Sequence, residues 1–138
     1  MSFLLDTNVI SEYRKGAACD PNVAVWFGKV ADAQLFLSVL VMGELRKGAE
    51  AKARHDPAQA NVLREWIAKL EARYGDRILP FGRAEADIWG RMNALRPRSA
   101  VDSMLAATAK VHGMALVTRN VADVEGLGVE VLNPFKRP

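Results

Sequence analysis

Hydrophobic residues along the chain fall into two kinds of pattern. Short, mostly apolar runs, typical of strands, occupy residues 2–5, 35–38, 77–81, 115–118 and 129–132. Longer segments between them carry apolar residues at helical spacing, as Val62, Trp66, Ile67 and Leu70 do. These segments predict helices over residues 8–15, 21–30, 39–50, 57–74, 83–96 and 99–112.

Strands that alternate with helices predict a parallel sheet, because parallel neighbours need a crossover of about a dozen residues or more. We therefore expect an α/β fold with a central parallel sheet of four to five strands and helices on both faces. Pro21 suits a first helical turn, and Gly113 suits a helix end. Nothing marks a boundary within residues 1–138, so a single domain is expected.

Composition narrows the class of protein. Half of the 138 residues are hydrophobic and 25% are charged, which is ordinary for a soluble globular chain. No apolar run is long enough for a membrane span, and no secretory signal is visible. Cys19 is the only cysteine, and the histidines His55 and His112 lack metal-ligand spacing. These features predict a cytoplasmic protein without disulfides, zinc or a membrane partner.

The net charge of +3 and the pI near 9.2 suggest an anionic partner. The basic residues come in small groups, such as Arg14 with Lys15 and Arg46 with Lys47. For any single pair, a solvated helix face is the better explanation. The charge therefore suggests an anionic partner without proving one, and no basic cluster is long enough to be a nucleic-acid arm by itself.

An acid stands directly after the first apolar run, in the segment FLLDTNVISE. Asp6 can be explained as the cap of the helix that follows, because its side chain can accept an orphan backbone N–H. It can also be explained as a site residue, because ligands collect at the carboxyl ends of parallel strands. Taken alone, Asp6 fits the cap better.

Three further acids have the same two explanations. Ser99 and Asp102 fit a capping box, and Asn120 can cap a short helix that carries Asp123 in its first turn. Glu44 lies at the edge of the apolar face of its helix, where a glutamate is often only a surface residue. Each acid by itself can therefore serve to begin or solvate a helix.

Together the four acids point to chemistry. If they meet at one sheet edge, their mutual repulsion calls for a proton or a cation. Oxygen ligands without nearby His or Cys favour Mg²⁺ or Mn²⁺, which commonly also binds phosphate oxygens. Metal-assisted hydrolysis of a phosphodiester is the natural reaction for such a group.

The segments LLDTNVISE, SVLVMGELRKG and AVDSMLAATAKVHGMALVTRNVADVEGLGVEVLNPF closely resemble the PIN-domain family. Within it, they are most similar to the VapC-type and FitB-like toxins of type II toxin–antitoxin pairs. The resemblance spans nearly the whole chain and is weakest over residues 51–80. It implies a Mg²⁺- or Mn²⁺-dependent ribonuclease, RNA as substrate, a cognate VapB- or FitA-like antitoxin and a homodimer.

The resemblance also implies roles for residues. The catalytic and metal-binding acids are Asp6, Glu44, Asp102 and Asp123, with Asp6 and Asp102 nearest to the ion. The auxiliary residues near the site are Thr7, Asn8 and Asn120. The candidate RNA-binding residues are Arg14, Arg46 and Arg119, although an ion pair is an equal explanation for Arg119. Arg98, Ser99 and Ala100 depart from the apolar or proline residues that the family often has there.

Two other functions fit parts of the pattern. A phosphoacceptor signalling domain also places aspartates at strand ends and binds Mg²⁺, but it needs adjacent acids there and leaves Glu44 without a role. A non-catalytic binding protein needs the acids only as helix caps. Divalent-metal binding and RNA cleavage together distinguish these alternatives from a nuclease.

Overall fold

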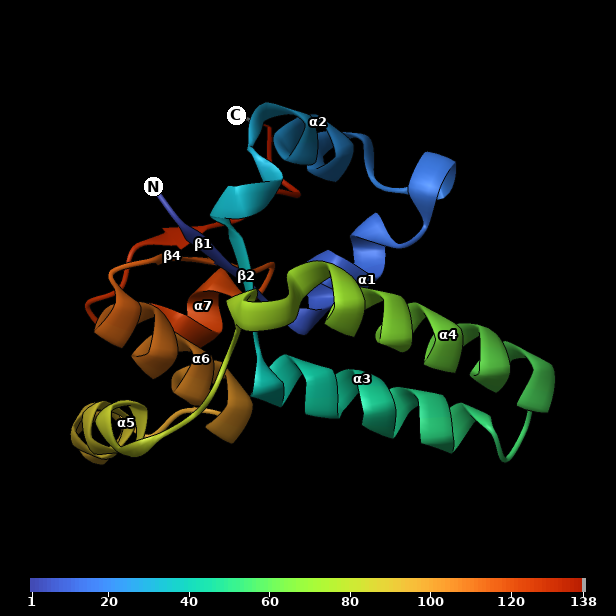
Figure 1. Ribbon diagram of the computed structural model, residues 1–138. Coiled ribbons are helices and arrows are strands. Elements are labelled where there is room, and N and C mark those ends of the chain that lie inside the picture. Colours follow the sequence, from blue (N-terminus) through green and yellow to red (C-terminus); the bar gives the residue numbers. More distant parts are fainter. Residues whose placement is uncertain (138) are drawn as a thin grey trace.

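The computed structural model describes residues 1–137, and its centre is a five-stranded sheet (Figure 1). The strands are β1 (Phe3–Leu5), β2 (Leu35–Ser38), β3 (Ile78–Leu79), β4 (Ala115–Val117) and β5 (Val131–Leu132). Their order is β3-β2-β1-β4-β5, and every pair is parallel. The predicted α/β class, the parallel pairing and the predicted number of strands are therefore confirmed.

Helices connect the strands, as the crossover argument requires. They are α1 (Thr7–Tyr13), α2 (Pro21–Lys29), α3 (Val39–Lys52), α4 (Pro57–Tyr74), α5 (Arg83–Leu95), α6 (Ala100–His112) and α7 (Val121–Val124). Figure 1 shows α3 and α4 as a hairpin that projects from the sheet, with α5 and α6 at the opposite end. All three residues of β1 are buried, and since successive strand residues face opposite sides, both sheet faces are covered.

Local chemistry explains where several helices begin and end. Asp20 caps α2 by accepting hydrogen bonds from the N–H groups of Asn22 and Val23, and Pro21 follows it in the first turn. Asp56 caps α4 in the same way. Gly113 ends α6 with a φ of 65°, a left-handed conformation that glycine adopts without steric cost.

Two strands are shorter by two residues or more than the predicted runs, whereas β1 and β4 are shorter by one residue. The run at 77–81 yields only Ile78–Leu79, because Arg77 closes a turn and donates hydrogen bonds to the carbonyls of Asp32 and Leu35. The run at 129–132 yields only Val131–Leu132, because the chain is still turning at Gly128, where φ is 74°. Both differences arise from turns that an apolar pattern does not reveal.

The strand register brings distant parts of the chain to one edge. Phe3 pairs with Leu35 on one side and with Ala115 on the other, so the carboxyl ends of β1, β2 and β4 lie together. The backbone N–H of Asp6 donates to Val117 O at 2.9 Å, directly beyond β1. Within residues 1–137, no helix has the length and apolar character needed to cross a membrane. Cys19 is buried and unbridged.

Candidate active site at the sheet edge

Asp6 is both a helix cap and a buried acid. Its Oδ1 accepts the Thr7 N–H at 2.7 Å, which caps α1. Its Oδ2 accepts the Thr118 hydroxyl at 2.6 Å and the Asn8 amide at 3.3 Å. Only 4% of the residue is exposed to solvent. Both explanations of Asp6 therefore apply, because one oxygen serves the helix and the other is held within the sheet edge.

Opposing effects act on the Asp6 carboxyl group. Burial raises its pKa above the ordinary value of 3.8, and the nearby Glu44 carboxylate adds to that rise. Hydrogen bonds from Thr118, Thr7 and Asn8 lower the pKa, because they stabilise the ionised form. Burial wins, so this carboxyl holds its negative charge less readily than an exposed aspartate and gains from a nearby cation.

Glu44 reaches the same edge from α3. The Thr7 hydroxyl donates to Glu44 Oε1 at 2.5 Å and so joins α1 to α3 beside Asp6. Glu44 also lines a cavity of about 260 Å³ between α1, α3 and α4, together with Arg14 and Trp66. Glu44 is therefore held at the sheet edge and faces an open space.

Asp102 and Asp123 complete the group of acids. Burial raises the pKa of Asp102 above 3.8, and the carboxylates of Asp6, Asp123 and Glu44 raise it further. Acids that repel one another in this way lie close enough to share one electrostatic environment. The fold thus brings together the four acids that the sequence singles out.

The predicted capping box at Asp102 is absent, although Asp102 does lie in the first turn of α6, where an acid suits the helix dipole. Ser99 is the N-cap residue of α6, but its side chain makes no capping hydrogen bond. Its carbonyl instead accepts the backbone N–H and the hydroxyl of Ser103. Asn120 likewise stands at the N-cap of α7 without a side-chain cap. Neither Asp102 nor Asp123 is therefore part of a capping box.

The group suits a hard divalent cation in the nature of its donors, all of which are oxygens. Within residues 1–137, however, no group of three or more His, Cys, Asp or Glu side chains is arranged so that it could hold a metal ion. Mg²⁺ in proteins is commonly held by only one or two carboxylates, with waters and substrate phosphates as its other ligands. The residues fit that kind of site and do not fit an all-protein cage.

Thr118 is a site residue that the sequence reasoning missed. It follows β4 as Asp6 follows β1, is 1% exposed, and donates to Asp6 while its oxygen accepts the Asn120 N–H at 3.0 Å. Asn8 ties the same loop by accepting the Arg119 N–H at 3.2 Å. The signal in the sequence was the position of Thr118, because a polar residue directly after a buried inner strand lies at the same sheet edge as the acids.

Arg98 connects the two helices that carry the last two acids. Its guanidinium donates to the carbonyls of Ala122 at 3.3 Å and Glu125 at 2.7 Å, on either side of Asp123. Its backbone N–H donates to Asn93 at 2.8 Å. The departure from the family pattern at Arg98 therefore adds a link between the start of α6 and α7.

The three candidate RNA-binding arginines have different surroundings. Arg14 lies 5.5 Å from the centre of the Trp66 ring, in the cavity that Glu44 lines. Arg119 stacks on Phe135 at 4.5 Å, and among residues 1–137 it forms no ion pair within 4 Å. Arg46 lies 3.8 Å from Glu50, and a helix residue two positions from Glu44 does not share its face. Arg14 and Arg119 adjoin the acids, and Arg46 points elsewhere.

Known proteins resemble this chain in fold and along nearly its whole length. The PIN domain model matches residues 3–122. Toxin FitB of Neisseria gonorrhoeae is 31% identical over 140 residues, covering 96% of this chain and 97% of its own. The VapC ribonuclease Y4jK of Sinorhizobium fredii is 32% identical over 141 residues, with coverages of 96% and 97%.

Solved structures give the same result. FitAcB from Neisseria gonorrhoeae superimposes with a TM-score of 0.85 at 30% identity, covering 96% of this chain and 98% of that one. A toxin–antitoxin complex from Klebsiella pneumoniae shares the fold at 21% identity, with a TM-score of 0.70 and coverages of 96% and 98%. With a family model that matches most of its residues and relatives that match end to end, this chain belongs to the PIN domain family.

Proposed function

We propose that this chain is a metal-dependent ribonuclease and the toxin of a type II toxin–antitoxin pair. The observation that carries the proposal is the buried Asp6 at the carboxyl edge of a parallel sheet, with Glu44 repelling it and with Asp6, Glu44 and Asp123 all repelling Asp102. The FitB and VapC relatives, similar along their full length, supply the reaction and the biological role. RNA is the substrate class that this combination supports.

The proposed cofactor is Mg²⁺ or Mn²⁺, held by Asp6 and Asp102, with Glu44 and Asp123 acting through bound water. When bound, such an ion lowers the pKa of a water molecule and offsets charge on the scissile phosphate. Two direct carboxylates are compatible with the finding that, within residues 1–137, no group of three or more acids could hold a metal ion.

The remaining chemistry belongs to the chain itself. Thr118, Thr7 and Asn8 fix the Asp6 carboxylate and keep both of its oxygens oriented. Glu44 or Asp123 accepts the proton of the attacking water. Arg14 and Arg119 contact RNA phosphates on either side of the acids, and Asn120 orients the loop after β4 through its bond to Thr118.

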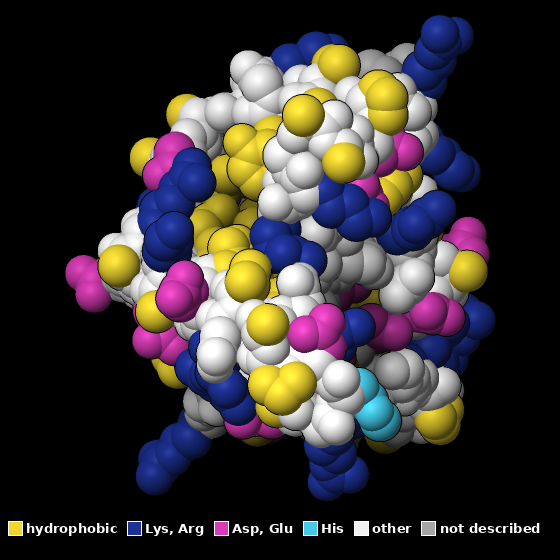
Figure 2. All heavy atoms as spheres, turned by 90° about the vertical axis from the view of Figure 1, so that its right-hand side faces the viewer, with side chains coloured by type: hydrophobic (Ala, Val, Ile, Leu, Met, Phe, Trp, Pro, Cys, Tyr) yellow, Lys and Arg dark blue, Asp and Glu magenta, His cyan; other side chains and the backbone are white. Residues whose placement is uncertain are grey.

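The proposed partner is a cognate antitoxin of the VapB or FitA type. A nuclease that acts on cellular RNA needs an inhibitor, and we place both proteins in the cytoplasm, where the RNA is. Figure 2 shows one face of the molecule, on which hydrophobic side chains gather in a hollow bordered by Lys and Arg. Such a face suits an antitoxin segment with apolar and acidic residues. A homodimer is the proposed assembly of the toxin.

The two alternative functions lose support. A phosphoacceptor domain has no use for Glu44, yet Thr7 holds Glu44 beside Asp6. A purely capping role does not explain Asp102, whose predicted capping box is absent from the described residues. The likeness to FitB and VapC proteins favours the nuclease over both.

The test compares two aspartates that both cap helices. Asp6→Asn keeps a good cap residue but removes the charge at the sheet edge, so we expect RNA cleavage to fall at least about 100-fold. Asp20→Asn makes the same chemical change at the start of α2, away from the acids, and cleavage should be unchanged. The measurement is the cleavage rate of single-stranded RNA with Mg²⁺ or Mn²⁺. Full activity in a folded Asp6→Asn protein would refute the proposal.

A further inference from the structure

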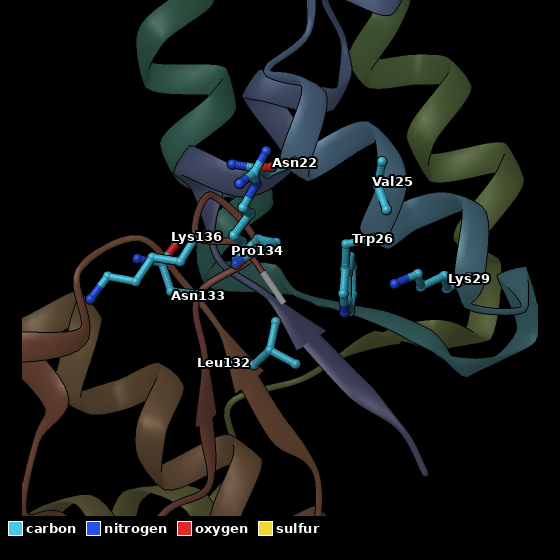
Figure 3. A pocket seen from close by; sticks show the side chains of 9 residues that line it. Asn22, Val25, Trp26, Lys29, Leu132, Asn133, Pro134 and Lys136 are labelled. Atoms are coloured by element: carbon cyan, nitrogen blue, oxygen red, sulfur yellow. The ribbon is translucent and has the colours of Figure 1, made fainter.

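A pocket of about 180 Å³ lies between α2 and the segment that follows β5 (Figure 3). Its apolar wall consists of Val25, Trp26, Leu132 and Pro134. In Figure 3 the Trp26 ring stands between Lys29 on one side and Leu132 and Pro134 on the other. The pocket therefore offers an aromatic ring together with aliphatic side chains, a suitable surface for a flat ring.

The rim of this pocket is positively charged. Lys29, Lys136 and Arg137 line it, and within residues 1–137 no Asp or Glu does. Asn22 and Asn133 are its other polar lining residues. An aromatic ring beside several cations and two amides suits an anionic ligand that carries a planar group.

The pocket is formed without any ligand, because the protein itself holds its walls. The Phe135 N–H donates to Asn133 Oδ1 at 3.0 Å, and the Asn22 amide donates to the Phe135 carbonyl at 2.8 Å. Trp26 packs edge-on against Phe3, with 5.2 Å between the ring centres. A preformed site loses little conformational entropy when it binds a ligand.

The pocket adjoins the edge that carries the acids. Leu132 ends β5 and Asp6 follows β1, and the carboxyl ends of these parallel strands lie on the same side of the sheet. Arg119 spans the interval: its guanidinium stacks on Phe135, and its N–H donates to Asn8, which in turn contacts Asp6. Arg119 thus places one positive charge between the acids and the segment that lines the pocket.

We propose that this pocket binds one nucleotide of the RNA substrate, outside the bond that is cut. The base stacks against Trp26, while Lys29, Lys136 and Arg137 contact the flanking phosphates. This inference rests on the proposed ribonuclease function and extends it to a second contact region. A nucleotide uses the flat Trp26 ring for its base and the flanking cations for its phosphates, so RNA is favoured over an acidic peptide, which is the other outcome of the tests below.

The first experiment measures binding with cleavage suppressed. A fluorescent single-stranded RNA of about ten nucleotides is titrated with the protein in EDTA, and its anisotropy is followed. We expect Lys29→Glu/Lys136→Glu to weaken binding about tenfold or more, and to reduce the slope of log K against log salt by about 1.4. The control, Lys69→Glu/Arg83→Glu, makes the same charge change at exposed positions on α4 and α5 and should shift binding less than about twofold.

The second experiment separates this inference from the ribonuclease proposal. With metal present, the Lys29→Glu/Lys136→Glu protein should cleave a dinucleotide at the wild-type rate but lose kcat/KM on the longer RNA. If the wild-type protein cleaves neither RNA, the ribonuclease proposal fails. If the double variant binds and cleaves the longer RNA as the wild type does, the pocket inference is overturned.

A third measurement identifies the occupant on the unaltered protein. RNA that contains 4-thiouridine should crosslink under ultraviolet light within the α2 peptide at Trp26. Crosslinks found only on other peptides would overturn the inference. So would a double variant that binds RNA normally but loses its affinity for the antitoxin, because the pocket would then be a protein-binding site.

Discussion

At the scale of single residues, the most consequential group is the hydrogen-bonded carboxylate of Asp6. A buried carboxylate is costly unless its oxygens are satisfied, and three donors supplied by Thr7, Asn8 and Thr118 satisfy this one. Two of the donors are neighbours of Asp6 in sequence, and the third lies 112 residues away. The long-range donor is therefore the one that ties the acid to the rest of the sheet edge.

Replacing Thr118 with Val tests that bond with almost no change in shape. The Oγ1–Oδ2 bond of 2.6 Å goes to a charged group, so its loss should cost about 1.5–3 kcal/mol of unfolding free energy. RNA cleavage should fall about 10- to 100-fold, because a partner that orients a metal-binding carboxylate is lost. Denaturant unfolding and cleavage rates measure the two effects.

Thr108→Val is the matched control. Thr108 is also fully buried, but its hydroxyl donates only to the Met104 carbonyl, at 2.8 Å, within α6. We expect a smaller loss of stability and no loss of cleavage. Equal cleavage by the two variants, both folded, would mean that the Thr118 bond serves stability alone.

The acids could be found from sequence because each lies beside a helix start or on a helix edge, where spacing predicts its position. Thr118 could not be found in that way, since a threonine after Val117 is also what a longer strand would contain. Its role depends on β4 lying beside β1, and that contact is non-local. The same limit applies to the absent Ser99 cap, which local spacing favoured.

At the scale of elements, the connection between α1 and α2 depends on Glu12. Its carboxylate accepts Lys15 Nζ and the Asp20 N–H, each at 2.9 Å, and Asp20 in turn caps α2. Periodicity and caps predicted both helices, although α1 ends at Tyr13, two residues before the predicted end. The turn at Gly16–Ala18 between them was not predicted, because it is held by side-chain contacts rather than by a hydrophobic pattern.

This connection should make stability depend on pH in the acid range. The hydrogen bonds from Lys15 and from the Asp20 backbone lower the pKa of Glu12 below its ordinary value of 4.5. A lowered pKa means that the stabilising contribution is fully present above the unfolded value and is lost as pH falls through the folded one. Glu12→Gln should therefore lower the melting temperature at pH 7, by less than Thr118→Val does.

The difference in melting temperature between the wild type and Glu12→Gln should shrink as the pH falls below about 4.5. Thermal unfolding between pH 7 and pH 3 measures it. Asp76→Asn, on the exposed turn before β3, is a suitable control and should show no such trend. A constant difference across this range would mean that Glu12 stabilises the turn by packing rather than by its charge.

At the scale of the whole molecule, a sheet edge that collects acids lies within a chain of net charge +3. Sequence patterns predicted the strands and their parallel direction. They did not supply the order β3-β2-β1-β4-β5, because adjacency between β1 and β4 depends on packing across most of the chain. The electrostatic stress at that edge is a property of the assembled fold, and it should be visible in global stability.

Removing one acid should relieve that stress. We expect Asp102→Asn to raise the melting temperature in EDTA, on the order of 3 °C, because Asp6, Asp123 and Glu44 repel Asp102. Millimolar Mg²⁺ or Mn²⁺ should raise the melting temperature of the wild type, because the ion binds the folded state. The same ion should raise the melting temperature of Asp102→Asn by a smaller amount. Calorimetry with and without metal measures both effects.

The control for this stability test is Asp87→Asn, which alters an exposed acid paired with Arg91 at 3.1 Å. Its melting temperature in EDTA should not exceed that of the wild type, and metal should raise it as much as it raises that of the wild type. A metal response that is equal in all three proteins would exclude Asp102 as a ligand, and the site would then have to rely on the other acids.

The hydrogen bond from Thr118 to Asp6 has a consequence for protein synthesis. Asp6 leaves the ribosome early, but β4 and Thr118 are made 112 residues later, followed by Asp123. A nascent chain therefore carries Asp6 before it carries Thr118, which holds Asp6, and before it carries Asp123. All three residues are present only after these segments have been translated. Chains released before this point lack part of the proposed active site, so we expect them not to cleave RNA.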